Sequence, residues 1–580
     1  MKIYKIIIIV GLLAISFLSC KKDFLDRTPL SQVDPDNYFK TGADLSTYCN
    51  SFYNYLPGTA IFNKDAVSDD VECSNSLLVQ GIRTVPTDAT SAGWTWSTLR
   101  NINYFLEHYN NAEVAENVKL QYAGVAKFFR AWFYFDMVKK FGDVPWYSTS
   151  LNESSPELFK ARDSRTLVID SVIADLDFAS TWLSGKKSID RVTKWTALAL
   201  KSRVALYEGT YRKYHTELNL GAQVQDLLQQ SYKAADSVMR FSGYKLFSTG
   251  HPESDYLTLF SEDNANPDEF ILAQVYDNAL STFHNANYVL TVSTSSLPSF
   301  NKSFIDQFLM DDGTPFSSRA GYKTETFLQE TKNRDPRLSQ IIRTPGYKRI
   351  GTTQNLVPDL SVAPTGYQCI KYMTTPSQDG WNINTNDLPV FRYAEVLLNF
   401  AEAKAESGSL TQDDLDRSIN LIRSRARMPP IVKGNIVPDA ELQNLYQNVS
   451  DPNILEIRRE RNVELAMEGF RYDDIMRWKV GDLLARPFYG MYYPQKGSMD
   501  MDGDGKADIS VLDQKPVNPD PSIQYYILGT DHKLSDGDHG NIMVYPNLAK
   551  TFNDPRDYLY PLPLTELLLN KNLVQNPKWN

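Results

Sequence analysis

The sequence predicts a mainly α-helical protein whose helices come in pairs and pack against a loop-rich region with short strands. Two observations predict this fold class. Apolar residues recur at i, i+3, i+4 and i+7 in several segments before residue 242 and again after residue 391, which is the spacing of one buried helix face. The stretch between them, residues 243–390, is rich in Asn, Asp, Ser, Thr, Pro and Gly, which favours loops and turns.

The first 19 residues have the organisation of an export signal. Lys2 and Lys5 give a basic start, and the apolar run that follows has about 13 residues, fewer than the ~20 of a membrane-spanning helix. The run ends at Ser19-Cys20, which resembles a bacterial lipoprotein cleavage site. We therefore expect residues 1–19 to be removed and Cys20 to be lipidated. An ordinary signal peptide is the alternative, because the residues just before Ser19 depart from the strictest form of the site.

Residues 20–45 are the predicted tether of this anchor. Pro29 and Pro35 disfavour helix at the residue before each of them, so we expect extended chain here. Two or more acyl chains hold a protein stably at a membrane. The sequence therefore predicts a protein of the bacterial envelope.

Residues 46–242 form the predicted N-terminal helical part, with two helix pairs. In the first helix, Val125, Phe128, Phe129 and Trp132 follow helical spacing, and a Gly-then-Pro stop follows at residues 142–145. Its partner covers about residues 164–183. The second pair covers Thr193–Tyr211 and about residues 225–241.

Residues 243–580 form the predicted C-terminal part, with two more pairs. These are Phe391–Glu406 with Asp413–Arg427, and Pro452–Met467 with Arg471–Leu484. Each first helix has small residues among large ones, so about four pairs resemble tetratricopeptide-like units, which stack because one pair cannot bury its face alone. There is no clean 34-residue period, and about 150 residues separate the second pair from the third.

Short strands are expected within the loop-rich stretches. Residues 270–275 form one short apolar run in the 243–390 stretch, and residues 485–556 have a similar composition. Long loops on a rigid scaffold are where binding surfaces usually lie. Because no Gly/Ser linker or charge run divides the chain, we expect one structural unit.

The charge balance excludes one class of partner. The net charge is −10, and removal of the leader with Lys2 and Lys5 takes it to −12. Nucleic-acid phosphates require clustered Lys and Arg, so we expect no nucleic-acid binding. With Cys20 lipidated, Cys49, Cys73 and Cys369 remain, which leaves at least one thiol unpaired; a Cys49–Cys73 disulfide and three free thiols both fit the count.

Two groups of residues are candidates for ligand binding. The first group combines two tryptophans with polar side chains just before and within a predicted helix, and the second lies in the loop-rich stretch. Aromatic rings bury the apolar C–H faces of sugars while Asn and Arg bond hydroxyl groups, which is the mixture typical of ligand sites. The alternative is that one or both tryptophans pack in the core. The candidates are Trp94, Trp96, Arg100 and Asn101, and then Tyr288, Trp381 and Asn382.

No motif indicates catalysis. The sequence has no HExxH, no GxSxG and no Gly-rich phosphate loop followed by Lys, and its six histidines lack ligand spacing. The carboxylate-rich segment from Glu460 to Trp478 places opposite charges on shared helix faces, for example Arg461 and Glu464. That arrangement favours an ion-pair network within and between helices. We therefore expect no catalytic residue and no catalytic cofactor.

One segment has the oxygen spacing of a calcium loop. Asp500, Asp502, Asp504 and Asp508 occupy relative positions 1, 3, 5 and 9, with Gly at position 6. Position 12 is Val511 rather than the bidentate Glu of a complete EF-hand. A structural Ca²⁺ site and a solvated acidic turn are both compatible with this pattern.

Several segments together resemble the SusD/RagB family of nutrient-binding outer-membrane lipoproteins. They span nearly the whole mature chain in the order seen in that family, and the segment from Glu460 to Trp478 is the most specific. The segments are Cys20-Lys21-Lys22-Asp23-Phe24-Leu25-Asp26, Arg130–Phe135 leading to Phe141–Pro145, Arg392–Leu398 with Ala401-Glu402-Ala403 and Ile422-Arg423, Glu460–Trp478, and Tyr560-Pro561-Leu562-Pro563 with Glu566 and Gln575-Asn576-Pro577.

The resemblance implies a SusD-like fold and a function in nutrient uptake. It implies four helix pairs that support a ligand-facing region, a SusC-like TonB-dependent transporter as partner, attachment to the cell outer membrane, and an oligosaccharide ligand. It also implies that Trp94 and Trp96 stand where the starch-binding member carries stacking tryptophans. Peptide uptake of the RagB type is the alternative. A surface-anchored glycoside hydrolase and a helical scaffold that binds only proteins are further alternatives from other classes.

Overall fold

The computed structural model describes residues 38–72, 81–295, 298–529 and 532–579. The predicted signal peptide, Cys20 and the tether before residue 38 lie outside these ranges, and so does Cys73. Cys49 and Cys369 are buried free thiols, which favours the alternative without a Cys49–Cys73 disulfide. Within the described ranges, no helix is both long enough and apolar enough to cross a bilayer.

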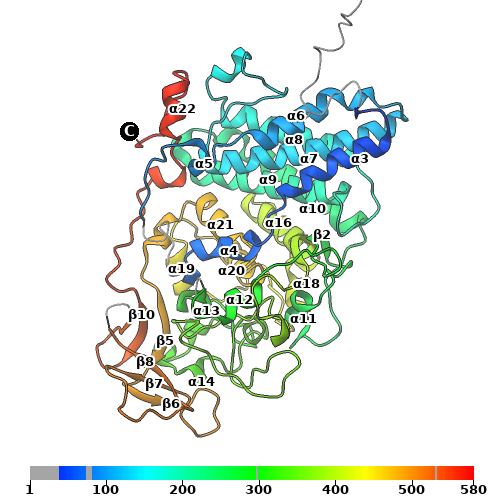
Figure 1. The fold of residues 1–580 in the computed structure, drawn as a ribbon. Coiled ribbons are helices and arrows are strands. Elements are labelled where there is room, and N and C mark those ends of the chain that lie inside the picture. The colour runs from blue at the N-terminus through cyan, green and yellow to red at the C-terminus, as the bar shows by residue number, and fades with distance from the viewer. Residues whose placement is uncertain (1–37, 73–80, 296–297, 530–531, 580) are drawn as a thin grey trace, which may run out of the picture.

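A layer of long helices crosses the top of the molecule in the view of Figure 1. Within it, α7 packs on α8, α8 on α9, and α9 on α10, so the two predicted N-terminal pairs are confirmed. The helices of the N-terminal part of the chain are α3 (Gly42–Asn50), α4 (Ala60–Asn63), α5 (Ala89–Ala92), α6 (Ser97–His108), α7 (Glu116–Phe141), α8 (Arg165–Trp182), α9 (Lys194–Tyr214) and α10 (Val224–Phe241).

Local sequence explains where these helices begin and end. α9 starts at the N-cap Thr193, whose hydroxyl accepts a hydrogen bond from the Thr196 amide in a capping box. α7 stops at Gly142, which has a φ of +74°. The turn requires glycine for this conformation, and a Cβ would also lie close to Leu559, 3.0 Å from its Cδ1.

The helical stack continues across the long insertion. α10 packs directly on α16, and α16 packs on α20, so helices separated by about 150 residues of sequence are neighbours in space. The helices of the C-terminal part are α16 (Tyr393–Glu406), α17 (Gln412–Asp416), α18 (Ile419–Arg425), α19 (Ala440–Leu445), α20 (Pro452–Glu464), α21 (Arg471–Arg477) and α22 (Leu564–Leu569).

The later helices differ from the predicted pairs in two ways. The second helix of the third pair is divided into α17 and α18 at Arg417-Ser418, where the backbone leaves helical geometry. In the fourth pair, α20 packs on α16 whereas α21, only seven residues long, packs on α9. The chain of 44% helix and 9% strand is mainly α, as the sequence predicts.

The insertion between α10 and α16 consists of short elements joined by turns. Its strand β2 lies where a strand was predicted and pairs with β4 in antiparallel register, with Phe270 opposite Arg392. β1 pairs with β3 in the same sense. The elements of the insertion are α11 (Asp255–Ser261), β2 (Phe270–Gln274), α12 (Ala286–Thr291), β3 (Ser299–Phe300), α13 (Lys302–Ile305), α14 (Phe327–Glu330), α15 (Leu338–Ile341) and β4 (Leu388–Arg392), whereas β1 (Val71–Glu72) comes from the N-terminal part.

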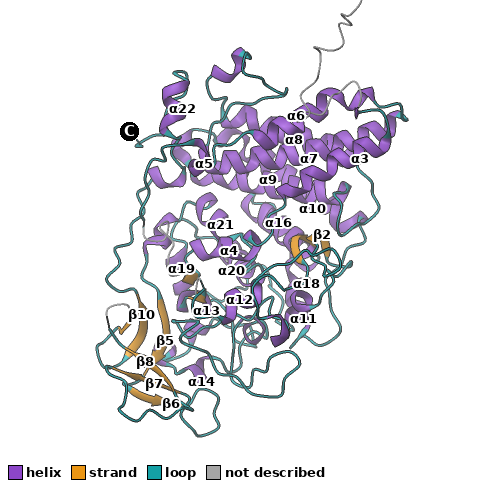
Figure 2. Cartoon of the chain, in the orientation of Figure 1, coloured by secondary structure: helices purple, strands orange, loops and turns teal. Residues whose placement is uncertain are grey.

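Residues 489–544 form a strand lobe at the lower left of Figure 2. It contains two three-stranded sheets in the orders β5-β10-β9 and β6-β7-β8. All pairings are antiparallel except β7 with β8, which is parallel. The strands are β5 (Tyr489–Tyr493), β6 (Gly497–Met499), β7 (Ile509–Leu512), β8 (Gln524–Ile527), β9 (His532–Leu534) and β10 (Gly540–Val544).

The segment from Glu460 to Trp478 forms the buried ion-pair network that its sequence predicts, although with other partners. Glu464 on α20 accepts hydrogen bonds from Arg337 (3.0 Å), Arg392 (2.7 Å) and Arg425 (2.5 Å). Arg461 pairs with Asp474 at 2.8 Å rather than with Glu464 on its own helix. Burial alone would raise the pKa of Glu464, but the three guanidinium groups outweigh burial and hold it well below its usual value. The charges therefore join α20 to the end of β4, to α18 (Ile419–Arg425) and to the turn before α15 (Leu338–Ile341).

Candidate ligand-binding surfaces

The first predicted group begins at two tryptophans just before α6. Trp94 is only 3% exposed, and its ring packs edge-to-face against Phe141 (4.9 Å between centroids) and Trp96 (5.2 Å). Trp96 is half-buried and contacts Tyr147 edge-to-face at 5.4 Å. Trp94 therefore packs in the core and offers almost no free ring face, whereas Trp96 keeps part of its surface accessible.

Arg100 and Asn101 lie on different faces of α6. Arg100 is exposed and lies on the side of the tryptophans. The Asn101 side chain points to α3 and the turn after it, where it accepts a hydrogen bond from the Tyr48 hydroxyl (2.5 Å) and donates one to Ser51 Oγ (3.1 Å). Asn101 thus links α6 to the N-terminal helix, and the structure does not bring it together with Trp94, Trp96 and Arg100.

Trp94, Trp96 and Arg100 line a cavity of about 870 Å³, here called the α6–α22 cavity. Its other walls come from the loop after α7, through Tyr147 and Leu158, and from the C-terminal segment around α22, at the upper left of Figure 1. Asn103, three residues after Arg100, also lines it. The Asn103 amide is fully buried and donates to the carbonyls of Tyr147 (2.9 Å) and Thr149 (3.0 Å), so it fixes the loop that closes the cavity.

The second predicted group comes together although its members are far apart in sequence. Tyr288 on α12 and Trp381 in the loop before β4 contact each other edge-to-face, with 5.1 Å between ring centroids and 85° between planes. Trp381 is 61% exposed, and Asn382 beside it is also exposed. We call Tyr288, Trp381 and Asn382 the aromatic platform. An exposed indole ring held beside a second aromatic ring offers a flat apolar face on which a ligand can stack.

Buried hydrogen bonds hold the two sides of the platform together. Asn287, next to Tyr288, donates from its side chain to Thr374 Oγ1 (3.0 Å) and Asp379 Oδ1 (3.2 Å) and accepts from the Thr374 amide (3.0 Å). The backbone amide of Asn287 donates to Asn384 Oδ1 at 3.1 Å. Because Asn287 is fully buried, these bonds fix α12 against the loop that carries Trp381.

Arg349 and His284 form further contacts that hold the loop carrying Trp381. Arg349 forms an ion pair with Asp379 and donates from Nε to the Thr374 carbonyl at 2.6 Å. His284 pairs with Asn384 through backbone bonds of 3.1 Å in both directions. Its Nε2 contacts the Asn386 carbonyl at 2.8 Å, and its Nδ1 accepts from the Ala286 amide at 3.2 Å, which requires the neutral ring with hydrogen on Nε2. Burial lowers the pKa of His284 to about 4, so this form persists near neutral pH.

The bracing residues were not predicted as functional. Asn287, Arg349 and Asp379 support the platform without belonging to it, and no sequence motif marks them. The only sequence signal is a polar residue in the apolar run of α12, where a buried amide requires partners.

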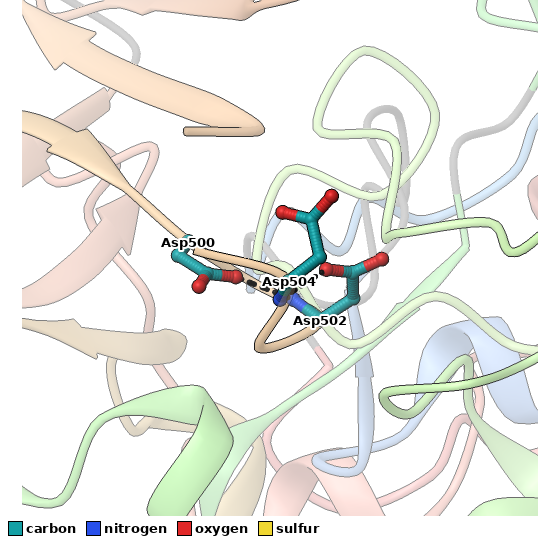
Figure 3. Close-up of side chains that lie close together, drawn as sticks. All are labelled: Asp500, Asp502 and Asp504. Carbon is teal, nitrogen blue, oxygen red and sulfur yellow. Dashed lines mark hydrogen bonds between the residues drawn. The ribbon is translucent and has the colours of Figure 1, made fainter. Parts of the chain in front are cut away.

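Three of the four aspartates predicted to bind calcium lie together, as Figure 3 shows. One carboxylate oxygen from each of Asp500, Asp502 and Asp504 lies within 4.8 Å of the others. Asp500 accepts hydrogen bonds from the Gly503 (2.6 Å) and Gly505 (2.8 Å) amides, which close the turn. The donor set of three carboxylates fits a hard cation such as Ca²⁺.

The fourth predicted ligand lies apart from this group. One carboxylate oxygen of Asp508 accepts a hydrogen bond from the Met501 amide at 2.7 Å. Asp508 does not belong to the group formed by Asp500, Asp502 and Asp504. Lys506 also competes for the site, because its Nζ lies 3.2 Å from Asp504 Oδ2. The structure therefore offers a smaller ligand set than the sequence spacing predicts.

Comparison with known families gives a consistent result. The model of the SusD family matches residues 268–579, which is more than half of the chain. A second model, described as starch-binding associating with outer membrane, matches residues 23–206. SusD-like protein P2 of Formosa agariphila is 24% identical over 604 residues and covers 99% of both chains. SusD-like protein P38 of the same organism is 24% identical and covers 85% of this chain and 95% of its own.

Solved structures share the fold at low sequence identity. A SusD-like protein of Bacteroides fragilis superposes with a TM-score of 0.69 at 21% identity, covering 95% of this chain and 100% of its own. A SusD-like carbohydrate-binding protein of the same organism gives 0.66 at 22% identity, with 93% and 100% covered. These similarities confirm the SusD-like fold that the sequence predicts.

Proposed function

This chain belongs to the SusD family, and we propose that it binds an oligosaccharide at the cell surface and delivers it to a SusC-like TonB-dependent transporter of the outer membrane. The observation that carries the proposal is the exposed Trp381 ring, held against Tyr288 by a braced loop. The names of the second matched family and of one structural neighbour, which refer to starch and carbohydrate binding, support a glycan ligand.

Binding would be non-covalent. A sugar ring lies on the indole of Trp381, Tyr288 forms the neighbouring wall, and Asn382 hydrogen-bonds hydroxyl groups. Because the Asn287 and Arg349 contacts already fix the loop, little conformational freedom is lost on binding. Of the residues predicted to bind ligand, we retain Tyr288, Trp381 and Asn382 for the glycan.

The proposed anchor and transporter follow from the family and from the N-terminal sequence. Cys20 precedes the first described residue, Tyr38, by a segment that spans at most about 65 Å when fully extended, long enough to hold the folded part near the membrane. Cys20→Ala should release the protein from the membrane fraction. Unchanged membrane retention would contradict the anchor.

We also propose that the aspartate loop holds a structural Ca²⁺. Asp500, Asp502 and Asp504 would supply carboxylate oxygens, and the ion would supply positive charge that stiffens the turn between β6 and β7. No part of glycan binding depends on it.

A binding screen tests the proposed function. The protein without residues 1–20 is titrated against a panel of polysaccharides and peptides, and product formation is assayed in the same samples. Binding of a glycan without cleavage supports capture. Cleavage would favour a surface hydrolase, and binding of peptides alone would favour uptake of the RagB type.

A further inference from the structure

The α6–α22 cavity carries charge that the fold leaves unpaired. Three charged side chains line it, namely Arg100, Glu153 and Glu566, so two carboxylates face one guanidinium group. In the part of the chain that the structure describes, no Lys or Arg nitrogen lies within ion-pairing distance of Glu153 or Glu566. The lining therefore has a net negative charge, and neither of its two glutamates forms an ion pair with a described Lys or Arg.

Glu566 is the least exposed of these three side chains. It lies in the first turn of α22 and is half-buried, and burial raises the pKa of its carboxyl group. Its charge also contributes to the raised pKa of Tyr147, after burial and Asp163, which places the carboxylate near that ring. A desolvated carboxylate beside an aromatic ring favours a cationic partner.

Neighbouring polar groups do not supply that partner. Lys160 approaches the Tyr147 ring at 5.6 Å, but its ammonium group is bound to Asp163 (2.5 Å) and to the Trp146 carbonyl (3.1 Å). Asn570, one turn after Glu566, uses its amide to bond the carbonyls of Leu158 (3.4 Å) and Lys160 (2.9 Å). These bonds hold the cavity wall in place and leave the Glu566 carboxylate open to a ligand.

The aromatic and aliphatic side chains of the remaining walls suit a ligand whose ammonium group is attached to a ring or an aliphatic chain. Trp96 and Tyr147 meet at 5.4 Å between ring centroids with an angle of 78° between their planes, and both rings line the same cavity as the Glu566 carboxylate. An ammonium group within about 6 Å of such a ring face is attracted to its π electrons. Leu158 and Leu573 complete the apolar wall. The volume of about 870 Å³ is within the range of small-molecule sites.

We propose that the α6–α22 cavity is a second binding site, separate from the aromatic platform, that takes a ligand carrying a primary ammonium group. The ammonium group binds between Glu566 and the rings of Trp96 and Tyr147, and Arg100 at the exposed side of the cavity bonds hydroxyl or acidic groups of the same ligand. No residue of the platform lines the cavity, so this inference stands independently of glycan binding there. An amino sugar and a lysine side chain share this chemistry.

Calorimetric titration with matched probes tests the proposal. The probes are a glucosamine trimer, the corresponding N-acetylglucosamine trimer, and a lysine-containing tripeptide with blocked termini, in a buffer that keeps the amines protonated. The protein lacks residues 1–20 and is compared with Glu566→Gln and with Glu157→Gln. Glu157 is an exposed glutamate on the same loop as Leu158 and does not line the cavity, so it is the control for a change of net charge.

We expect at least one amine probe to bind, the N-acetylated trimer to bind more weakly than the free amine, and Glu566→Gln to lower the amine affinity by about 10-fold. Glu157→Gln should leave it unchanged, and equal thermal midpoints for the two variants would show that both fold. Binding of the sugar amine alone assigns an amino sugar, and binding of the peptide alone assigns a lysine side chain. Failure of both amines to bind would overturn the proposal, as would equal affinities of the amine and N-acetyl forms or equal effects of the two variants.

Discussion

Replacement of Trp381 by alanine should abolish most of the glycan affinity and leave the fold intact. Trp381 is 61% exposed, and among the residues that the structure describes Tyr288 is the one aromatic side chain that contacts it, so removal of the indole opens no core cavity. Substitutions at such surface positions usually change the free energy of unfolding by no more than about 0.5 kcal/mol.

The expected loss of affinity follows from the area that a sugar would cover. A tryptophan side chain offers about 150–250 Å² of surface, of which a sugar stacked on one face removes roughly 60–100 Å² from water. At ~25 cal/mol per Å² this burial contributes about 1.5–2.5 kcal/mol. Since each 1.4 kcal/mol is a factor of ten, Trp381→Ala should raise Kd about 10- to 60-fold.

The assay is calorimetric titration of the glycan identified by the panel. Trp182→Ala is the matched control, because Trp182 is a tryptophan with 40% exposure at the end of α8, outside the platform. The Kd of Trp182→Ala for the glycan should equal that of the wild type. If Trp381→Ala bound the glycan as tightly as the control, stacking on the platform would be refuted, and a thermal midpoint far below the control would show that Trp381 supports the fold instead.

Three further predictions concern stability. Glu464→Gln should lower the free energy of unfolding by about 3–5 kcal/mol, because Arg337, Arg392 and Arg425 lose their shared anion; an unchanged urea midpoint would contradict this. Burial lowers the pKa of His284 from 6.5 to about 4, so the unfolded chain binds more protons between these values, and stability should fall by roughly 3 kcal/mol as pH drops through this window. His284→Gln should flatten that slope, and equal slopes would refute the assignment. Excess Ca²⁺ should raise the thermal midpoint of the wild type but not of Asp502→Asn, and equal responses would exclude the proposed ion.

Periodicity predicts the helical stack well because each helix buries one continuous face. α8 and α10 begin and end within one residue of the predicted positions, and α7 stops at the predicted Gly142. The split of the third pair at Ser418 was missed, because the apolar spacing continues on both sides of a local backbone break. The contact between α10 and α16 could not be predicted from periodicity either, because periodicity describes single helices and not the packing of helices that are distant in sequence.

Helix geometry explains which of the predicted residues on α6 line the α6–α22 cavity. Trp96, Arg100 and Asn103 are spaced i, i+4 and i+7 and all face the cavity, whereas Asn101 is one residue from Arg100 and is therefore turned by about 100°. Helical spacing from Trp96 therefore predicts Asn103, and not Asn101, as a lining residue of the cavity. By contrast, nothing local distinguishes buried Trp94 from accessible Trp96, since burial depends on Phe141 and Tyr147 from other elements. The contact of Tyr288 with Trp381 likewise arises only from the tertiary fold.

A crystal structure of the protein with its bound oligosaccharide tests the central claim most directly. We predict a sugar ring stacked on the indole of Trp381, with Tyr288 beside it and Asn382 in hydrogen-bonding distance of a hydroxyl group. A glycan bound elsewhere, with the Trp381 ring still open to solvent, would contradict the account.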